Sequence, residues 1–145
     1  MSEVAMKEIA ANGSGWRPIP LPLKVLFVVF ALWMVGSVIN LPNLYENGMP
    51  VFGTFVYGMN AAMLPLFLDF IGPGTFLFAL WGRKRWAALW AFAYNGIFIL
   101  NNTVAFFALR EELGVPQILG PTVASLVFVA VIFWKRNYFE RAPQS

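Results

Sequence analysis

The sequence predicts an all-α integral membrane protein, an antiparallel bundle of four transmembrane helices with both termini in the cytoplasm. Three observations lead to this fold class. The 145-residue chain is 59% hydrophobic and only 12% charged, whereas soluble domains carry about 25% charged residues. Its apolar residues form long runs that polar or Pro/Gly-containing segments separate. When these runs alternate across a bilayer, every Lys and Arg except Arg110 falls on one side.

The first transmembrane helix follows a polar leader. Residues 1–22 are expected to form an N-terminal tail and a Pro-rich link, because Pro18, Pro20 and Pro22 favour an extended approach to the helix. The helix is predicted at about residues 23–40, which is close to the length that crosses about 30 Å of hydrocarbon. The segment around Pro42 is expected to end this helix, and a loop should follow it up to Pro50.

The second apolar run, residues 51–81, would be about 46 Å long as one helix, which exceeds the thickness of a membrane. We predict a helix at about residues 60–81, with residues 51–59 at the outer interface. This choice places Trp81 at the inner interface, beside the basic cluster that follows it. The alternative ends the span at Ile71 and makes Thr75 to Gly82 a short re-entrant segment.

A kink or break is expected in this second helix near Asp69 and Pro73. Pro73 has no backbone N–H and cannot donate to the Asp69 carbonyl four residues earlier. Gly72 and Gly74 weaken the helix further at the same place. Such a break is tolerated in a membrane only where protein or water satisfies the freed backbone groups.

The third and fourth helices are predicted at about residues 86–109 and 118–134, with a polar loop between them. The transmembrane domain would then comprise residues 23–134. A polar cytoplasmic tail is expected at residues 135–145. The basic residues that border these spans indicate orientation in a membrane rather than binding to nucleic acid.

Asp69 is the only aspartate in the chain, and the counted distance from Trp81 places it near the middle of the membrane. A carboxyl at that depth is costly and should face the bundle interior or a cavity. The third helix offers a small, polar face to meet it. This face is made of residues at helical spacing: Ala88, Ala91, Asn95, Asn102 and Ala105.

Two interpretations of these groups remain open. In the first, Asp69 as a neutral acid hydrogen-bonds Asn95 and only fixes the packing of two helices. In the second, the groups line a polar, ligand-binding pocket that the break in the helix opens. The candidate ligand-binding residues are Asp69, Asn95, Asn102, Thr75, Ser125 and Asn60.

The composition removes most catalytic chemistries. The chain has no histidine and no cysteine, and its single aspartate cannot form a catalytic pair. We therefore expect no enzymatic activity, no metal site and no cofactor. The favoured function is a non-enzymatic ligand-binding, lipid-binding or accessory subunit. The alternative is a homo-oligomeric transporter or channel that uses Asp69 as a proton- or cation-coupled site.

The expected surroundings follow from the same features. The partners are the lipid bilayer, further copies of the chain or a larger membrane complex, and a small apolar or amphipathic ligand. The expected location is the cytoplasmic (inner) membrane of a prokaryote, and nucleic acid is not expected as a partner.

Overall fold

The computed structural model of the protein describes residues 15–141. Four helical stretches in this part of the chain are long and apolar enough to cross a membrane, which confirms the predicted helical bundle at this level. One of the stretches, Gly58–Trp81, consists of two α-helices joined by a π-helix. The elements in order are α2 (Leu21–Asn47), β1 (Met49–Val51), β2 (Thr54–Val56), α3 (Gly58–Pro65), the π-helix η1 (Leu66–Ile71), α4 (Gly72–Trp81), α5 (Ala87–Leu113), α6 (Val115–Trp134) and α7 (Asn137–Glu140).

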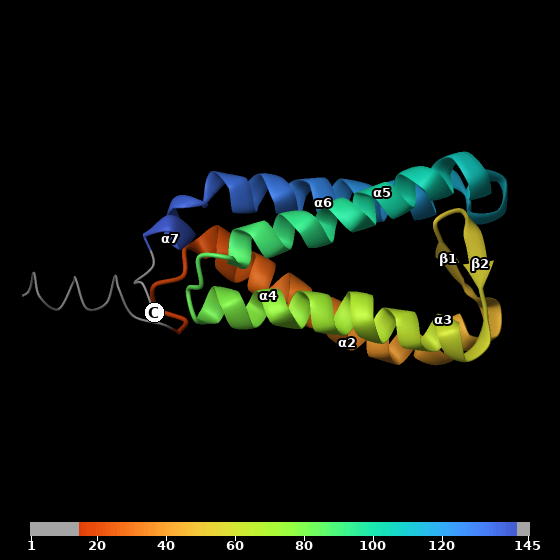
Figure 1. The fold of residues 1–145 in the computed structure, drawn as a ribbon, viewed down its shortest axis with the longest axis horizontal. Coiled ribbons are helices and arrows are strands. Elements are labelled where there is room, and N and C mark those ends of the chain that lie inside the picture. The colour runs from red at the N-terminus through yellow and green to blue at the C-terminus, as the bar shows by residue number, and fades with distance from the viewer. Residues whose placement is uncertain (1–14, 142–145) are drawn as a thin grey trace, which may run out of the picture.

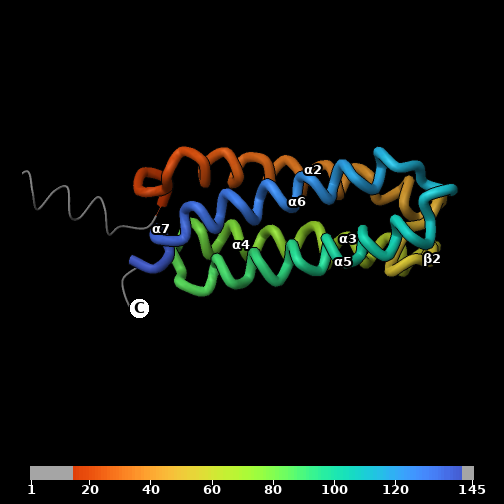
Figure 2. Tube along the Cα trace, turned by 90° about the horizontal axis from the view of Figure 1, so that it is seen from above, coloured from red at the N-terminus to blue at the C-terminus, as the bar shows by residue number. Residues whose placement is uncertain are grey.

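The bundle consists of two helical hairpins. The first pairs α2 with α3, η1 and α4, and the second pairs α5 with α6 (Figure 1). The hairpins lie close together at the end that carries α7, which we call the closed end. They diverge toward the end that carries β1 and β2, which we call the wide end (Figure 1). Seen from above, α2 lies beside α6 and α4 lies beside α5 (Figure 2).

The closed end holds the main hydrophobic core. Large apolar side chains from α2, α4, α6 and α7 meet there with almost no exposed surface, among them Leu23, Phe76, Leu80, Ile132 and Phe139. Their close packing stabilises the bundle because helices in lipid associate through van der Waals contact rather than through the hydrophobic effect. Many large apolar side chains on the outer faces of the helices are exposed, as a lipid-facing surface requires.

A side-chain contact fastens α7 to the loop between α4 and α5. Arg83, which is buried, donates from Nε to the backbone carbonyl of Tyr138 at 3.1 Å. Its guanidinium also lies 5.0 Å from the centre of the Tyr138 ring. The backbone of Arg83 has a positive φ of 52°, which is uncommon for a residue with a side chain. The segment expected as a polar tail thus folds back on the core through Tyr138 and Phe139.

A short antiparallel hairpin, which the sequence did not predict, crosses the wide end. Strand β1 pairs with β2, and the two residues between them, Phe52 and Gly53, have φ values of 44° and 84°. Positive φ at both central residues is the tight turn that suits the twist of a hairpin. The hairpin is held against α5, because the Phe52 N–H donates to Asn101 Oδ1 at 2.7 Å.

The helices extend further at the wide end than expected. The first helix runs past Pro42 to Asn47 instead of ending at about residue 40, so the predicted loop up to Pro50 is largely helix and strand. Pro42 cannot donate to the Val38 carbonyl four residues earlier, but transmembrane helices tolerate such a proline because neighbouring groups can satisfy the freed carbonyl. The expected polar loop between the third and fourth helices shrinks to Gly114, whose φ of 77° turns the chain.

The remaining boundaries stay close to expectation. The second stretch begins at Gly58 rather than at about residue 60, and it ends at Trp81 as expected. It is helical throughout, with a change from α- to π-helical hydrogen bonding at Leu66–Ile71, and the kink near Asp69 and Pro73 stays a prediction. The predicted polar tail at residues 1–14 and the last residues, 142–145, lie outside the described part of the chain.

Candidate functional site: a cavity between the two hairpins

Asp69 lies in the π-helix η1, and the local sequence explains why. Pro73 provides no N–H for the Asp69 carbonyl, so the hydrogen-bond pattern has to change just before it. The N–H of Gly72 reaches back five residues to the carbonyl of Phe67, which is the π-helical pattern. Short π-helical turns of this kind often occur at functional sites.

The π-helix also sets which face of the stretch is buried. Ala61 and Leu80 both have no exposed surface, although an uninterrupted α-helix would place them about 100° apart around its axis. The π-helical turn between them rotates the chain by a smaller angle per residue, so that both residues come to lie on the same face of the stretch. Asp69 consequently lies on the buried face, with only 8% of its surface exposed, while Phe67 and Phe70 on the same turn are exposed.

The side chains that face the Asp69 carboxyl come from α2. The Trp33 indole and the Ser37 hydroxyl face it as hydrogen-bond donors. The other carboxyl oxygen, Oδ1, is buried and has no hydrogen-bond partner among the described residues. Asn95, the partner expected from the sequence, instead donates to the carbonyl of Ala91 in its own helix at 2.8 Å. The Asp69–Asn95 hydrogen bond of the first interpretation is therefore not observed between these two described residues.

Asp69 lines a cavity of about 630 Å³ between the two hairpins. One wall is a single face of α2, where residues recur three or four positions apart. These residues are Trp33, Gly36, Ser37, Asn40 and Leu44. Because a helix rises 1.5 Å per residue, this wall runs about 16 Å from the middle of the bundle toward the wide end. The hairpin residues Met49 and Pro50 border the cavity at that end.

The opposite wall comes from α5 and α6. It is rich in amides, with Asn101 and Asn102 from α5 and Gln117 from α6, beside Phe98 and Pro121. The amide nitrogen of Asn102 is buried and has no hydrogen-bond partner within residues 15–141. Two unpartnered polar atoms, the Asp69 carboxyl oxygen and this nitrogen, therefore belong to residues that line the same cavity.

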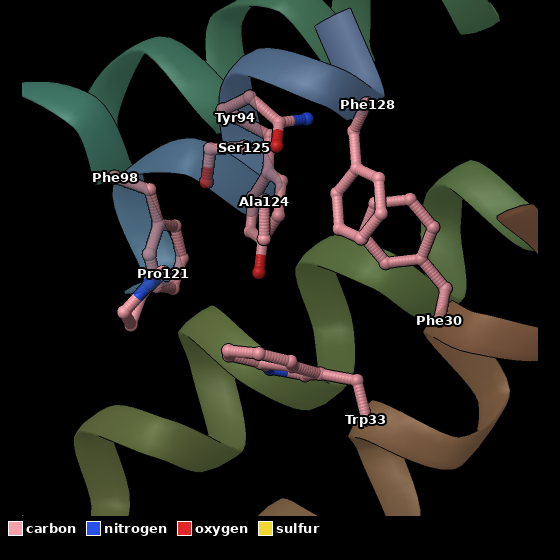
Figure 3. A pocket seen from close by; sticks show the side chains of 9 residues that line it. Phe30, Trp33, Tyr94, Phe98, Pro121, Ala124, Ser125 and Phe128 are labelled. Carbon is pink, nitrogen blue, oxygen red and sulfur yellow. The ribbon is translucent and has the colours of Figure 1, made fainter. Parts of the chain in front are cut away.

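A smaller, mostly aromatic pocket of about 20 Å³ lies next to the cavity and toward the closed end. The two share Trp33, Phe98 and Pro121. Figure 3 shows the Trp33 ring on one side of this pocket, with Tyr94 and Phe98 opposite it and with Phe30 and Phe128 at its flank. Asn95 and Ser125 contribute its polar lining. Its volume is about that of one water molecule.

Close packing between α5 and Gly72, the first residue of α4, fixes the position of η1 next to the aromatic pocket. The Trp90 indole of α5 donates to the Gly72 carbonyl at 3.0 Å. A Cβ added to Gly72 would come within 2.3 Å of the Tyr94 ring, so only glycine permits this approach. The ring of Tyr94 also lies within electrostatic range of Asp69. The contact at Gly72 therefore holds both the Asp69 carboxyl and the Tyr94 ring of the aromatic pocket in place.

Within the described chain, the cavity lining contains a single acidic group and no basic group. Asp69 is the only ionisable side chain that lines it, and no Lys or Arg of the described chain does so. The chain between residues 15 and 141 contains no group of three acidic residues that could hold a metal ion. The cavity can therefore offer one carboxyl, one hydroxyl, four amides and aromatic rings to a ligand.

The six residues expected from the sequence separate into three sets. Asp69 and Asn102 line the large cavity, while Asn95 and Ser125 line the aromatic pocket beside it. Thr75 and Asn60 line neither, and Asn60 is exposed. Ser37 and Asn40 of the first helix also line the cavity but are not among these six residues. Further lining residues were not predicted either, among them Gly36, Tyr94, Phe98 and Gln117.

The chain matches no protein-family model, and no curated protein or solved structure matches it.

Proposed function

We propose that the protein is a non-enzymatic membrane protein that binds a small amphipathic ligand in the cavity between its two hairpins. The observation that carries this proposal is the pair of buried, unpartnered polar atoms, Asp69 Oδ1 and Asn102 Nδ2, on residues that line a cavity of about 630 Å³. Each such atom costs about 1–3 kcal/mol when it stays unsatisfied. A ligand that supplies hydrogen-bond partners would recover this free energy.

The size and lining of the cavity also suit a ligand. Ligand sites usually measure about 300–1,000 Å³ and are mostly apolar, with a few polar groups that orient the ligand. Here Trp33, Phe98 and Pro121 form the apolar part. An adjoining apolar cavity of about 190 Å³ shares Met49, Phe98 and Asn101 with it. An amphipathic molecule would place its polar group near Asp69 and its apolar body along these surfaces.

We further propose that both termini face the cytoplasm of a prokaryotic cell and that the wide end faces outward. The distribution of charge supports this orientation, because the basic cluster Arg83, Lys84 and Arg85 lies at the closed end, whereas Glu111 and Glu112 lie at the wide end. The kink expected near Asp69 and Pro73 would lie in η1, since helices bend readily at π-helical turns and at proline.

The binding proposal can be tested by filling the cavity. Gly36 lines it, and a Cβ added there meets nothing within 4 Å, so Gly36→Phe should fill space without disturbing the backbone. Gly96→Phe is the matched control, because Gly96 is also helical and unobstructed but lies outside the cavity. Native mass spectrometry and solvent extraction of the purified proteins would identify small molecules that co-purify with each variant.

We expect the wild type and Gly96→Phe to retain the same co-purifying molecule and Gly36→Phe to lose it. All three should remain folded, because replacing a helical glycine gains up to about 1 kcal/mol of helix propensity. Equal retention by all three variants would place the ligand elsewhere. Absence of a co-purifying small molecule from the wild type, together with a stable partner chain, would favour an accessory subunit without a ligand.

One observation favours the alternative of a homo-oligomeric transporter. Asp69 is an ionisable side chain that faces a cavity inside a transmembrane segment, which is typical of proton- and ion-coupled sites. Under this alternative, Asp69→Asn would abolish substrate uptake driven by a pH gradient in proteoliposomes. A flat uptake trace from the folded, oligomeric wild type would exclude it.

A further inference from the structure

The chemistry of the cavity also indicates the charge of its ligand. Asp69 is the only ionisable residue that lines it, and the groups that face the carboxyl, Trp33 and Ser37, are neutral. A buried carboxylate without a counter-charge is unfavourable. A positively charged ligand would provide that counter-charge, whereas an anionic ligand would meet a like charge and no basic residue.

Aromatic rings border the cavity and the small pocket beside it. Trp33 and Phe98 line both, and Tyr94, which lines only the aromatic pocket, lies within electrostatic range of Asp69. Figure 3 shows the rings of Trp33, Tyr94 and Phe98 around this aromatic pocket. The faces of such rings attract cations, and binding sites for quaternary ammonium groups commonly combine several of them.

The lining favours an organic cation over an inorganic one. Small metal ions require several oxygen ligands at close range, preferably from more than one carboxylate. This cavity has only one carboxyl, beside one hydroxyl and four neutral amides, and the rest of its lining is mostly aromatic and aliphatic. The adjoining apolar cavity, lined by Leu64, Leu68 and Ile97, offers a surface for the apolar body of the ligand.

We propose that the cavity selects a lipophilic organic cation, with the positive group between Asp69 and the aromatic rings of Trp33 and Phe98 and the apolar body toward the wide end. This inference rests on the proposed binding function and specifies the chemical class of its ligand. The decisive measurement is therefore a comparison of binding between two molecules that have the same shape and opposite charges.

Tetraphenylphosphonium and tetraphenylborate provide that comparison, because they have nearly the same size and opposite charge. Binding of each would be measured by equilibrium dialysis with the full-length protein in nanodiscs of zwitterionic phosphatidylcholine. Empty nanodiscs serve for subtraction of partitioning into lipid. Quenching of tryptophan fluorescence gives an independent readout, because Trp33 lines the cavity. The measurement is repeated with added sodium chloride at constant ionic strength.

We expect saturable binding of tetraphenylphosphonium that is at least about tenfold tighter than binding of tetraphenylborate. Asp69→Asn should remove this preference, because it keeps the shape and polarity of the side chain but removes its charge. Glu46→Gln is the matched control: it removes a negative charge from an exposed position of α2 outside the cavity, and it should bind like the wild type. Gly36→Phe should weaken binding of both probes.

The possible outcomes separate the two proposals. Saturable binding of both ions with equal affinity, blocked by Gly36→Phe, would support the binding function and overturn cation selectivity. Retention of the preference in Asp69→Asn would overturn the role of the carboxyl. Displacement of tetraphenylphosphonium by sodium would identify an inorganic cation site instead. Absence of saturable binding of either ion would overturn the cation proposal, and the ligand-extraction experiment would then decide the binding function separately.

Discussion

The two ends of the bundle are built from the same four helices and are both apolar, yet one is solid and the other is hollow. At the closed end, Leu23, Phe76, Leu80 and Ile132 fill the space between the hairpins. At the wide end, the helices present small and polar residues beside a few aromatic and aliphatic ones, and they enclose a cavity of about 630 Å³. The difference lies in the size and polarity of the side chains that face the space between the hairpins.

This comparison shows how a membrane protein can position a site. Lipid tails are as apolar as leucine, so apolar residues alone do not draw helices together. Interdigitating large side chains hold one end closed, while amides and glycines at the other end leave room between the helices. The hairpin β1–β2, fastened to Asn101, then borders the space that remains. Stability and binding would thus depend on different halves of each helix.

The largest expected effect comes from breaking the closed end. Phe76→Ala removes a ring with only 1% of its surface exposed and should lower the free energy of unfolding by about 3 kcal/mol, because it leaves a cavity among large neighbours. Phe98→Ala at the wide end should cost roughly half as much or less, since that ring already borders empty space. Thermal unfolding in detergent, followed by circular dichroism, compares the two. Equal losses would mean that both ends contribute alike.

The junction between the two ends depends on the close approach at Gly72. Gly72→Ala should destabilise the protein by about 1–3 kcal/mol, because the new methyl group would clash with the Tyr94 ring. Gly96→Ala, where a Cβ meets nothing within 4 Å, should instead stabilise it by up to about 1 kcal/mol. Melting temperatures of the two variants should shift in opposite directions. An unchanged melting temperature of Gly72→Ala would show that the Tyr94 ring can move aside.

Removal of the side chain that fastens α7 should have an intermediate effect. Arg83→Ala leaves the Tyr138 carbonyl without its hydrogen bond from Nε and should cost about 1–3 kcal/mol. Binding at the wide end should remain unchanged, because Arg83 lies at the other end of the bundle. Stability and ligand binding would be measured on the same preparation. A parallel loss of binding would show that the two ends are coupled.

The smallest expected effect concerns pH. Burial raises the pKa of Tyr138 above its usual value of 10, although the nearby Arg83 opposes the shift. The folded state therefore favours the neutral phenol, so this contribution to stability is complete below about pH 10 and is lost as the pH rises through the raised pKa. Tyr138→Phe should reduce the alkaline decrease in melting temperature by a degree or two. An unchanged alkaline decrease would contradict this role.

Much of the fold could be predicted from the sequence, because length and hydropathy determine which segments can cross a membrane. Helix ends were harder to place. Proline and charged residues normally mark the end of a helix, but α2 continues past Pro42 and α5 includes Glu111 and Glu112. At the wide end the helices extend beyond the apolar spans, where polar residues are compatible with helix.

The site was predictable only in part. Asp69 and Asn102, which line the cavity, could be selected because polar residues are conspicuous in an apolar span. Trp33 and Gly36 were not chosen, because nothing in an apolar helix distinguishes the face toward a cavity from the face toward lipid. Gln117 was missed because α6 begins earlier than expected. The predicted Asp69–Asn95 pair failed because residue spacing gives the face of one helix but not the rotation of its neighbour.

The π-helix ties the orientation of the acid to the exact length of the chain. Deleting one residue between Leu66 and Ile71 would allow an ordinary α-helix to form there and would rotate one half of the stretch by about 100° against the other. Either Ala61 or Leu80 would then turn toward lipid, and the carboxyl would leave its place opposite α2. Insertions and deletions are usually tolerated in loops, but in this segment a single one would move the Asp69 carboxyl out of the cavity.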